Sequence, residues 1–532
     1  MSSLFLILIA TVVFLVAYVT YGAYLTKKWG IDPKRKTPAH TMSDGVDYVP
    51  AKAPVLLGHH FSSIAGAGPI VGPIGAAIFG WIPVFLWILV GSVFFGGVHD
   101  MGALFVSVRH EGKSLGEVIG ATIGKSGKKL FAIFAWLTLL LVIAAFTNIV
   151  ANTFVSVPEA ATASVLFIAV AIFFGIFVYR RGVNLAVGSV IGVALLILSI
   201  WVGTKFPLML GKTSWMLILM GYIFVASVTP VWVLLQPRDY LNSFLLYAML
   251  IGGFAGVIFM NPSLELASVT SFKIENATLF PMLFVTVACG AISGFHSLVG
   301  SGTTSKQIDS EKDVRLVGYG SMLIEGILAV LAIITASYVG ADKLKELLGN
   351  GGPVNVFSNG IGEFMTSIGI PMETGKSFTA LAISAFALTS LDTATRLARF
   401  IFQEFFGKES TAKQPVITNR YIATFITVAL GGALAFKGWK EIWPLFGSAN
   451  QLLAALALLS LAVWLKQNGK GHKVASIPMA FMFIVTLVAL VQLMIANLAN
   501  KILLFFAVAL FVLAIVLIIQ AQKSFKSVDK LE

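Results

Sequence analysis

The sequence predicts an all-α polytopic membrane protein with about fifteen transmembrane helices and an inverted-repeat core of broken helices. Of its 532 residues, 58% are hydrophobic and 11% are charged, and the mean hydropathy is +0.91. So few polar residues cannot coat a soluble globule of this size. Apolar runs long enough to cross a bilayer recur along the whole chain, and Gly/Pro clusters interrupt some of them.

The apolar runs have lengths of about 17–25 residues, which is the length that a helix needs to cross hydrocarbon. They lie at 3–24, 54–80, 82–106, 130–152, 163–179, 185–203, 214–236, 242–260, 279–303, 316–340, 376–400, 418–436, 446–466, 476–498 and 501–521. The first run lacks the basic start and cleavage site of a signal peptide, so we expect it to be retained as a span.

Basic residues in the short loops predict the orientation in the membrane. With the N-terminus outside and the C-terminus cytoplasmic, every arginine and most lysines fall on the cytoplasmic side. The net charge of +13 therefore orients helices in a lipid bilayer, and no nucleic-acid partner is expected. The loop at 341–375 lies outside in this topology, and its segment Asp342–Leu348 is helical in pattern, as a flap or a solvated connector.

The stretch from His59 to Gly72 places two imidazoles and two serines before a Gly/Pro run inside a predicted span. Such a run predicts unwinding, which hydrocarbon tolerates only where protein or a water-filled cavity covers the freed backbone. Transporters place their substrates at broken helices of this kind. The substrate-binding residues predicted at this break are Ser62, Ser63, Gly66 and Gly68.

An internal echo indicates inverted repeats. Residues 61–69 and 295–303 share the pattern F-x-S-[IL]-[AV]-G-[AS]-G, and the predicted topology makes them run in opposite directions. A second candidate break at Ser227–Pro230 also runs opposite to the first. Either pairing gives an odd number of helices per repeat, as inverted repeats require, so the sequence leaves both open.

Titratable side chains inside the predicted spans gather in the cytoplasmic half of the membrane. They are His59, His60, His99, Asp100, His296, Glu325 and Asp392. Such groups are costly in a bilayer and mark an ion path, a proton relay or a paired structural site. Because imidazole titrates near neutral pH, we expect proton coupling at His59, His60, His99, Asp100, His296 and Asp392. Neighbouring residues on a helix point about 100° apart, so His59 and His60 can share a site only where the backbone unwinds.

Hydroxyl side chains suggest where the rest of a substrate site lies. The span that contains His296 ends in a hydroxyl-rich segment with Ser297, Thr303 and Thr304, which could hold Na⁺ or a carboxylate. Thr229 could line the same cavity, with a helix kink as its alternative role. Asp392 has Arg396 four residues later, so a salt bridge is the simpler interpretation of that pair.

Three motifs resemble the carbon starvation protein A (CstA) family of bacterial inner-membrane transporters. They are G-H-H-F-S-S-I-A-G-A-G-P-I-V-G-P at 58–73, G-V-H-D-M-G-A-L-F at 97–105 with R-H-E-G-K-S at 109–114, and G-F-H-S-L-V-G-S-G-T-T at 294–304. The resemblance implies secondary active import of peptides, or of small carboxylates such as pyruvate, coupled to protons. It also implies a core like that of amino acid–polyamine–organocation transporters, whose five-plus-five repeats would favour pairing the breaks at 66–73 and 227–230.

Three regions are expected on this basis. Residues 1–53 would form an N-terminal helix and a cytoplasmic loop, 54–405 the transport core, and 406–532 a set of C-terminal scaffold helices. Asn450 and Gln451 are polar exceptions in the last region, where interhelical hydrogen bonding is the simplest explanation.

Two other classes of protein use some of the same residues. A haem-binding electron carrier would need axial histidine pairs at matching depths, and the sequence offers no clear set. A divalent-metal site could be built from His59, His60, His99 and Asp100. A hydrolytic enzyme is not expected because H-E-x-x-H is absent, and the single cysteine, Cys289, excludes a multi-thiolate site. No cofactor is expected apart from that possible metal.

Overall fold

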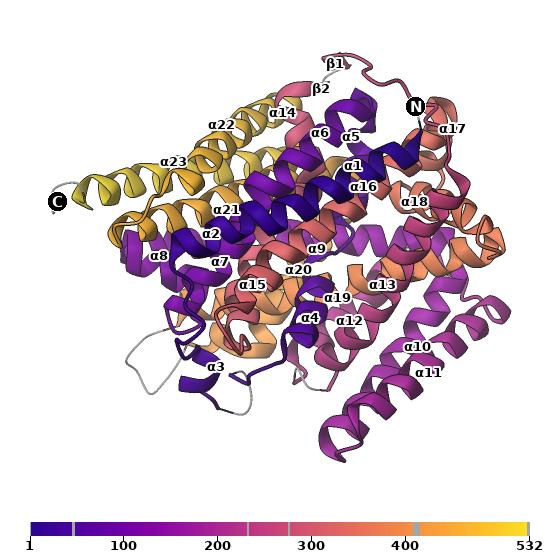
Figure 1. Ribbon diagram of the computed structural model, residues 1–532, viewed down its shortest axis with the longest axis horizontal. Helices are drawn as coiled ribbons and strands as arrows, with labels where there is room; N and C mark the ends of the chain where they lie inside the picture. The colour runs from indigo at the N-terminus through magenta and orange to yellow at the C-terminus, as the bar shows by residue number, and fades with distance from the viewer. Residues whose placement is uncertain (1, 45–47, 231–232, 275–276, 408–414, 529–532) are drawn as a thin grey trace.

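The computed structural model describes residues 2–44, 48–230, 233–274, 277–407 and 415–528. These residues form a bundle of helices with one short β-hairpin (Figure 1). Twelve of the described helices are long and apolar enough to cross a membrane, or thirteen if one bent pair counts as a span. Two shorter apolar helices, α12 (Lys212–Val228) and α20 (Arg420–Ala435), lie at two further predicted spans. The predicted class is confirmed, and the count of fifteen spans stays a prediction.

The elements follow the apolar runs in order. The first part of the chain contains α1 (Ser3–Ala17), α2 (Ala23–Trp29), α3 (Pro38–Thr41), α4 (Ala53–Ile64), α5 (Gly68–Ala76), α6 (Trp81–Gly91), α7 (Gly97–Arg109), α8 (Leu115–Ile123), α9 (Lys125–Ser156), α10 (Pro158–Phe174), α11 (Leu185–Lys205), α12 and α13 (Leu235–Met260). The second part contains β1 (Lys273–Ile274), β2 (Ala277–Thr278), α14 (Leu279–Val287), α15 (Gly294–Gly302), α16 (Ser321–Tyr338), α17 (Gly340–Gly349), α18 (Pro353–Thr366), α19 (Met372–Phe406), α20, α21 (Trp439–Gln467), α22 (Lys473–Ala496) and α23 (Lys501–Val528).

Short turns of other helix types continue or join these helices. The π-helical turns are Tyr18–Gly22, Ser92–Gly96, Gly175–Arg180 and Arg315–Gly320, and the 3₁₀ turns are Ala77–Phe79, Ala288–Gly290, Thr304–Lys306 and Val416–Thr418. Strands β1 and β2 pair antiparallel, with Lys273 opposite Thr278. Local sequence fixes several helix starts: the Ser114 hydroxyl accepts the N–H of Glu117 at the start of α8, and the Asn184 side chain accepts that of Ala186 at the start of α11.

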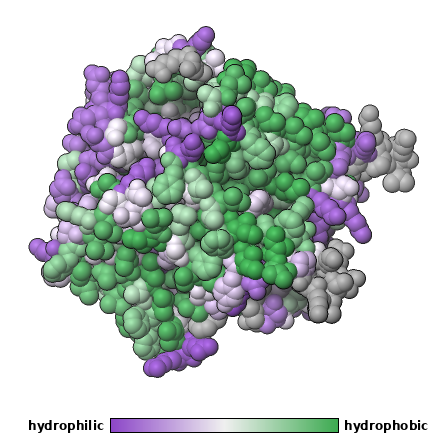
Figure 2. All heavy atoms as spheres, turned by 180° about the vertical axis from the view of Figure 1, so that it is seen from behind, coloured by the Kyte–Doolittle hydropathy of each residue, from purple (hydrophilic) through white to green (hydrophobic). Residues whose placement is uncertain are grey.

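Burial divides the bundle into a centre and a lipid-facing shell. Helices α16, α19 and α21 are almost wholly covered by their neighbours, whereas only a minority of the residues of α1, α11 and α23 are buried. Hydrophobic side chains cover much of the outer surface in Figure 2. A surface of that kind is stable against lipid and not against water, which agrees with a multi-pass membrane protein.

The first predicted break is confirmed. Helix α4 ends at Ile64, the chain leaves helical geometry at Ala65, and α5 begins at Gly68 with its axis turned by 46°. A second interruption lies in the span Leu279–Lys306, where α14 ends at Val287 and Ala288 has a φ of +42°. Helix α15 resumes at Gly294, so this break immediately precedes the sequence echo at 295–303.

The family resemblance favours 66–73 and 227–230 as the paired breaks of the two repeats. The structure shows the end of a helix at 227–230. Residues 227–230 end α12, because a residue before proline is driven out of the helical region, and Thr229 is extended. Helix α13 then starts at Leu235 as a separate long helix. Arg238, expected in a cytoplasmic loop, is consequently buried within α13. Within the described part of the chain, the two spans that carry the echo are both interrupted.

Two regions are more closely packed than the sequence suggested. The helical pattern at Asp342–Leu348 is confirmed as part of α17, but the following α18 is a buried helix that packs on α13, α16 and α19. Helix α21, assigned to the C-terminal scaffold, lies in the centre of the bundle and packs on α9 and α15. The boundary between residues 405 and 406 stays a prediction.

A buried ion pair fastens the N-terminal loop to the chain after α15. Glu311 is 1% exposed and accepts hydrogen bonds from Arg109 at 2.8 Å and from the backbone N–H of Asp32 at 2.9 Å. The Thr37 hydroxyl donates to the carbonyl of Ile308 at 2.5 Å. The ends of α2, α7 and α15 are therefore held together on the side that the basic loops predict to be cytoplasmic.

Arg109→Met is expected to lower the free energy of unfolding by about 3 kcal/mol, since it leaves the Glu311 carboxylate buried without its main partner. Thermal unfolding in detergent measures the loss. The matched control is Lys343→Met, which removes the exposed partner of Glu346, where both side chains are 54% exposed. That change should cost less than about 1 kcal/mol. Equal losses for the two variants would contradict the role given to Glu311.

Candidate functional site

The two broken helices touch each other at their interruptions. A Cβ added to Gly68 would lie 2.6 Å from the side chain of Cys289, which belongs to the second break. A Cβ added to Gly72 would overlap the carbonyl oxygen of Val287, the last residue of α14. Only glycine lets the backbones come so close. The Gly/Pro run thus does more than end α4, because it also allows α5 to lie against the second break.

Helix α21 satisfies backbone groups that the second break frees. The Asn450 side chain accepts the N–H of Phe295 at 2.9 Å and donates to the Ser293 hydroxyl at 3.1 Å. Gln451 donates to the carbonyl of Phe284. These contacts confirm interhelical hydrogen bonding as the role of Asn450 and Gln451. They also meet the requirement that irregular backbone at membrane depth be covered by protein.

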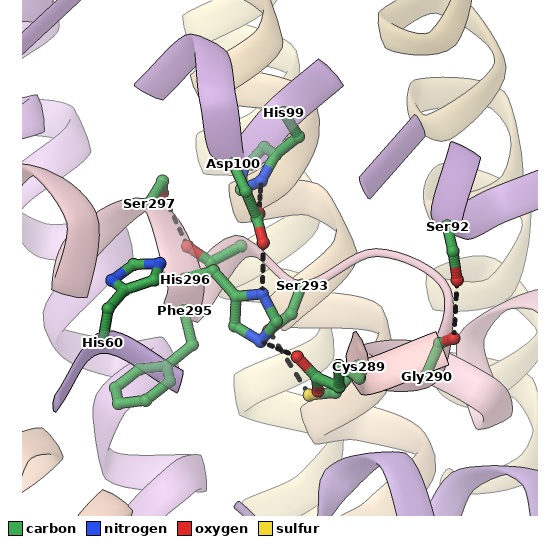
Figure 3. A network of polar contacts seen from close by, with 12 residues as sticks. His60, Ser92, His99, Asp100, Cys289, Gly290, Ser293, Phe295, His296 and Ser297 are labelled. Atoms are coloured by element: carbon green, nitrogen blue, oxygen red, sulfur yellow. Dashed lines mark hydrogen bonds and ion pairs between the residues drawn. The ribbon is translucent and has the colours of Figure 1, made fainter. Parts of the chain in front are cut away.

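Four titratable side chains form a continuous row beside the second break, and Figure 3 labels the first three of them. His99 Nδ1 lies 2.6 Å from Asp100 Oδ1, and Asp100 Oδ2 lies 2.8 Å from His296 Nδ1. His296 Nε2 lies 3.4 Å from Glu325 Oε2. We call His99, Asp100, His296 and Glu325 the histidine–carboxylate row. Helix α7 carries the first two, the start of α15 the third, and α16 the last.

The row is almost closed to solvent, since none of its side chains is more than 1% exposed. Each ring nitrogen of His296 faces a different carboxylate: Nδ1 is within hydrogen-bond distance of Asp100, whereas Nε2 and Glu325 are at ion-pair distance without a hydrogen bond. The sequence picked out Glu325 as a polar group in a span without giving it a role. Its contact with His296 makes Glu325 a member of the row. A carboxylate in an otherwise apolar helix is the sequence feature that indicates such a role.

The condition under which His59 and His60 could share one site, unwinding of the backbone between them, is not met. Helix α4 runs unbroken through both residues, so their side chains point in different directions. His60 Nδ1 lies 2.8 Å from the hydroxyl of Thr304, which follows α15. Figure 3 shows the His60 ring beside α15, near Phe295 and Ser297. His59 Nδ1 instead lies 4.0 Å from Asp239 Oδ2 on α13.

The predicted metal site is not formed for the same reason. Its four residues were His59, His60, His99 and Asp100. The two α4 imidazoles diverge, and His99 and Asp100 contact each other instead of converging on one point. Across the described ranges, no group of three or more His, Cys, Asp or Glu side chains is arranged to hold a metal ion.

Most of the predicted hydroxyls bond to their own helices. Ser63 donates to the carbonyl of His59, Ser297 to that of Gly294 and Thr303 to that of Val299. Thr229 donates to the carbonyl of Val225 at the end of α12 and does not lie at either break, which corrects its assignment. Hydroxyls in helices form such local bonds readily. Ser62, by contrast, is buried at the first break, and its hydroxyl has no hydrogen-bond partner.

Asp392 belongs to a second buried cluster, apart from the row. Its carboxylate lies 2.5 Å from Arg238 Nη1 and accepts the Tyr222 hydroxyl at 2.8 Å. The expected i+4 pair is corrected accordingly, since Arg238 is the close partner of Asp392. Arg396 donates to the carbonyls of Ala226 and Thr229 at the end of α12. A buried arginine on another helix gives Asp392 a partner that sequence spacing could not reveal.

Two helices broken at a shared point, with titratable groups buried beside them, define a secondary transporter with an inverted-repeat core. The chain belongs to the carbon starvation protein CstA family, whose family model matches residues 2–347 and 339–489. The family resemblance seen in the three sequence motifs is confirmed.

Similar proteins of known name are transporters. The peptide transporter CstA of Campylobacter jejuni is 33% identical over 567 aligned positions, covering 92% of this chain and 80% of that protein. The pyruvate/proton symporter BtsT of Escherichia coli is 32% identical over 548 positions, covering 86% of this chain and 76% of that protein. The crystal structure of a manganese transporter of Eremococcus coleocola aligns with a TM-score of 0.52 at 11% identity, covering 92% of this chain and 99% of that one. That likeness shows the fold alone.

Proposed function

We propose that the chain imports peptides, or small carboxylates such as pyruvate, across the bacterial inner membrane by proton-coupled alternating access. One similar protein is named a peptide transporter and another a pyruvate/proton symporter. A peptide and pyruvate both carry a carboxylate. The observation that carries the proposal is the histidine–carboxylate row, which joins α7 and α16 to the broken helix α15. The haem and metal alternatives have no comparable support.

The proposed substrate site lies where the two breaks meet. In the first turn of α5, Pro69 has no N–H and the N–H groups of Ile70 and Val71 bond to the carbonyl of Ala67, which leaves the N–H of Gly68 to attract a carboxylate. The Ser62 hydroxyl is buried there without a partner. Ser63, Gly66 and Gly68 would supply backbone contacts. Ser297, Thr303 and Thr304 would line the side of α15, and Thr304 is linked to His60.

Coupling would act through His296, which sits in the first turn of α15. When this imidazole carries a proton, it attracts Asp100 on α7 and Glu325 on α16 together. When the proton leaves, that attraction weakens and α15 is freer to move relative to its neighbours. Import requires the cytoplasmic side to open last, and we propose the orientation with the N-terminus outside and the C-terminus inside.

Proteoliposomes that contain the full chain test the function. Labelled pyruvate, free amino acids and a panel of di- and tripeptides are offered with and without an imposed inward pH gradient. We expect one of these classes to accumulate, and only with the gradient. Uptake that ignores the gradient, or that is unchanged in His99→Ala, would remove the proton role. Failure of the whole panel to accumulate would count against the substrate class.

Alternating access can be followed at Cys289, the single cysteine of the chain. It is 4% exposed and lies against Gly68 at the point where the breaks meet. A maleimide should therefore label it at least about tenfold more slowly in the closed protein than in unfolded protein, because thiol reactivity requires access. A transported substrate should change the rate. Cys289→Ser is the unlabelled control, and a rate equal to that of unfolded protein would contradict a closed junction.

A further inference from the structure

The second buried cluster is not used by the function proposed above. It joins four helices: His59 on α4, Tyr222 on α12, Arg238 and Asp239 on α13, and Asp392, Thr389 and Arg396 on α19. We call these residues, with Asn242, the arginine cluster. Its centre is the Arg238 guanidinium, which is 3% exposed and lies within 4 Å of two carboxylates.

The two carboxylates are paired unequally. Asp392 lies 2.5 Å from Arg238 and also accepts the Tyr222 hydroxyl. Oδ1 of Asp239 lies 3.8 Å from Nη2 of the same guanidinium, which is too far for a hydrogen bond, and the residue is 1% exposed. A buried carboxylate oxygen without a hydrogen-bond donor is costly, so the distant guanidinium leaves Asp239 incompletely satisfied.

A second unpartnered oxygen lies one helical turn away. The Asn242 amide donates to the carbonyl of Ala385 and to the Thr389 hydroxyl, which leaves its Oδ1 as the free atom. Residues 239 and 242 lie three apart on α13 and therefore share a face. A cavity of about 10 Å³ is lined by Arg238 and Asn242 but not by Asp239. It has room for one water or small ion, and none for pyruvate or a peptide.

We propose that Asp239, with Asn242 one turn away, binds a second coupling cation: a monovalent cation, either a proton on the Asp239 carboxylate or Na⁺ beside it. The inference rests on the proposed secondary transport and extends it from one cation site to two. A cation at Asp239 would offset the second negative charge near Arg238. Its departure would leave Asp239 and Asp392 competing for one guanidinium, which bridges α13 and α19.

Location links the cluster to both the surface of the bundle and the transport site. The His59 side chain is 21% exposed and faces Asp239, so it offers a path along which a cation can reach that carboxylate. On α19, Ser390 directly follows Thr389, and its hydroxyl lies against Gly66 and donates to the carbonyl of Ser63 at 3.4 Å. A shift of α19 caused by cation exchange would therefore reach the first break.

Cation binding to the detergent-purified full chain, without substrate, tests the proposal. One measurement is the proton uptake on titration from about pH 9 to about pH 5, a range in which an exposed carboxylate stays ionised. The other is binding of ²²Na⁺ at about pH 8.5, where proton competition is weak. We expect Asp239→Asn to take up close to one proton fewer than the parent chain, or to lose one bound Na⁺. The arm that responds identifies the cation. No difference in either arm overturns the proposal.

The controls separate Asp239 from its neighbours. Asp342→Asn removes an exposed carboxylate on α17 and should change neither measurement. Because the His59 imidazole faces Asp239 and can itself carry a proton, the comparison is repeated in a His59→Gln background, where the difference at Asp239 should persist. Asp239→Glu should retain the bound cation. If Asp239→Asn does not fold, Asn242→Ala decides: cation binding about tenfold weaker supports the site, and unchanged binding refutes it. Because no substrate is added, a failure here is distinct from a failure of uptake.

Discussion

Asp100→Asn is expected to reduce pH-gradient-driven uptake in proteoliposomes by about 100-fold, a loss in the range seen when a proton-transfer group is removed. The carboxylate of Asp100 contacts His99 on one side and His296 on the other, at 2.6 and 2.8 Å. Asparagine fills the same space but cannot carry the charge that favours a proton on His296. The variant should therefore bind substrate and fail to couple it to the gradient.

Counterflow distinguishes lost coupling from lost folding. Exchange of labelled for unlabelled substrate across the membrane needs no net proton movement, so Asp100→Asn should retain it within about tenfold of the parent rate. Asp342→Asn, on the exposed face of α17, should leave both assays unchanged. Equal losses of gradient-driven uptake and counterflow in Asp100→Asn would mean that Asp100 supports the structure and carries no coupling.

The helices could be predicted because hydrocarbon requires every span to satisfy its backbone hydrogen bonds internally. Each predicted apolar run contains a helix of the structure, and the break after Ile64 follows from glycines and prolines that cannot continue a helix. The break at Ala288–Ser293 has no such local signal, since it contains one glycine and no proline. It arises from tertiary contacts, with Asn450 binding the freed backbone and Gly68 admitting the Cys289 side chain.

Part of the candidate site could also be predicted from the sequence. Titratable side chains are rare in membrane spans, so His99, Asp100 and His296 are identified as important even when their partners are unknown. Which titratable groups contact each other depends on which helices are neighbours, and nothing in the sequence places Glu325 beside His296. The sequence places Arg238 in a loop because it lies between the apolar runs at 214–236 and 242–260. In the structure Pro237 lies in the first turn of α13, a position that helices tolerate, so the arginine continues into the bundle.

Gly72→Ala is expected to prevent the two broken helices from touching, and to lower the free energy of unfolding by about 3 kcal/mol or more. An added Cβ would overlap the carbonyl of Val287 and lie 2.7 Å from that of Thr286. Both atoms belong to backbone, so no side chain can turn aside to make room. Thermal unfolding in detergent and Cys289 labelling measure the effect, and labelling should become faster because the junction is forced open.

Gly221→Ala is the matched control, since this glycine also lies in an apolar helix, α12, but has no atom within 4 Å of an added Cβ. Alanine should stabilise that helix by up to about 1 kcal/mol through its higher propensity. The opposite signs of the two substitutions would show that close approach, and not glycine's flexibility, is what residue 72 provides. If Gly72→Ala is as stable as Gly221→Ala and keeps Cys289 protected, the contact between the breaks is absent, and a substrate site at their junction fails with it.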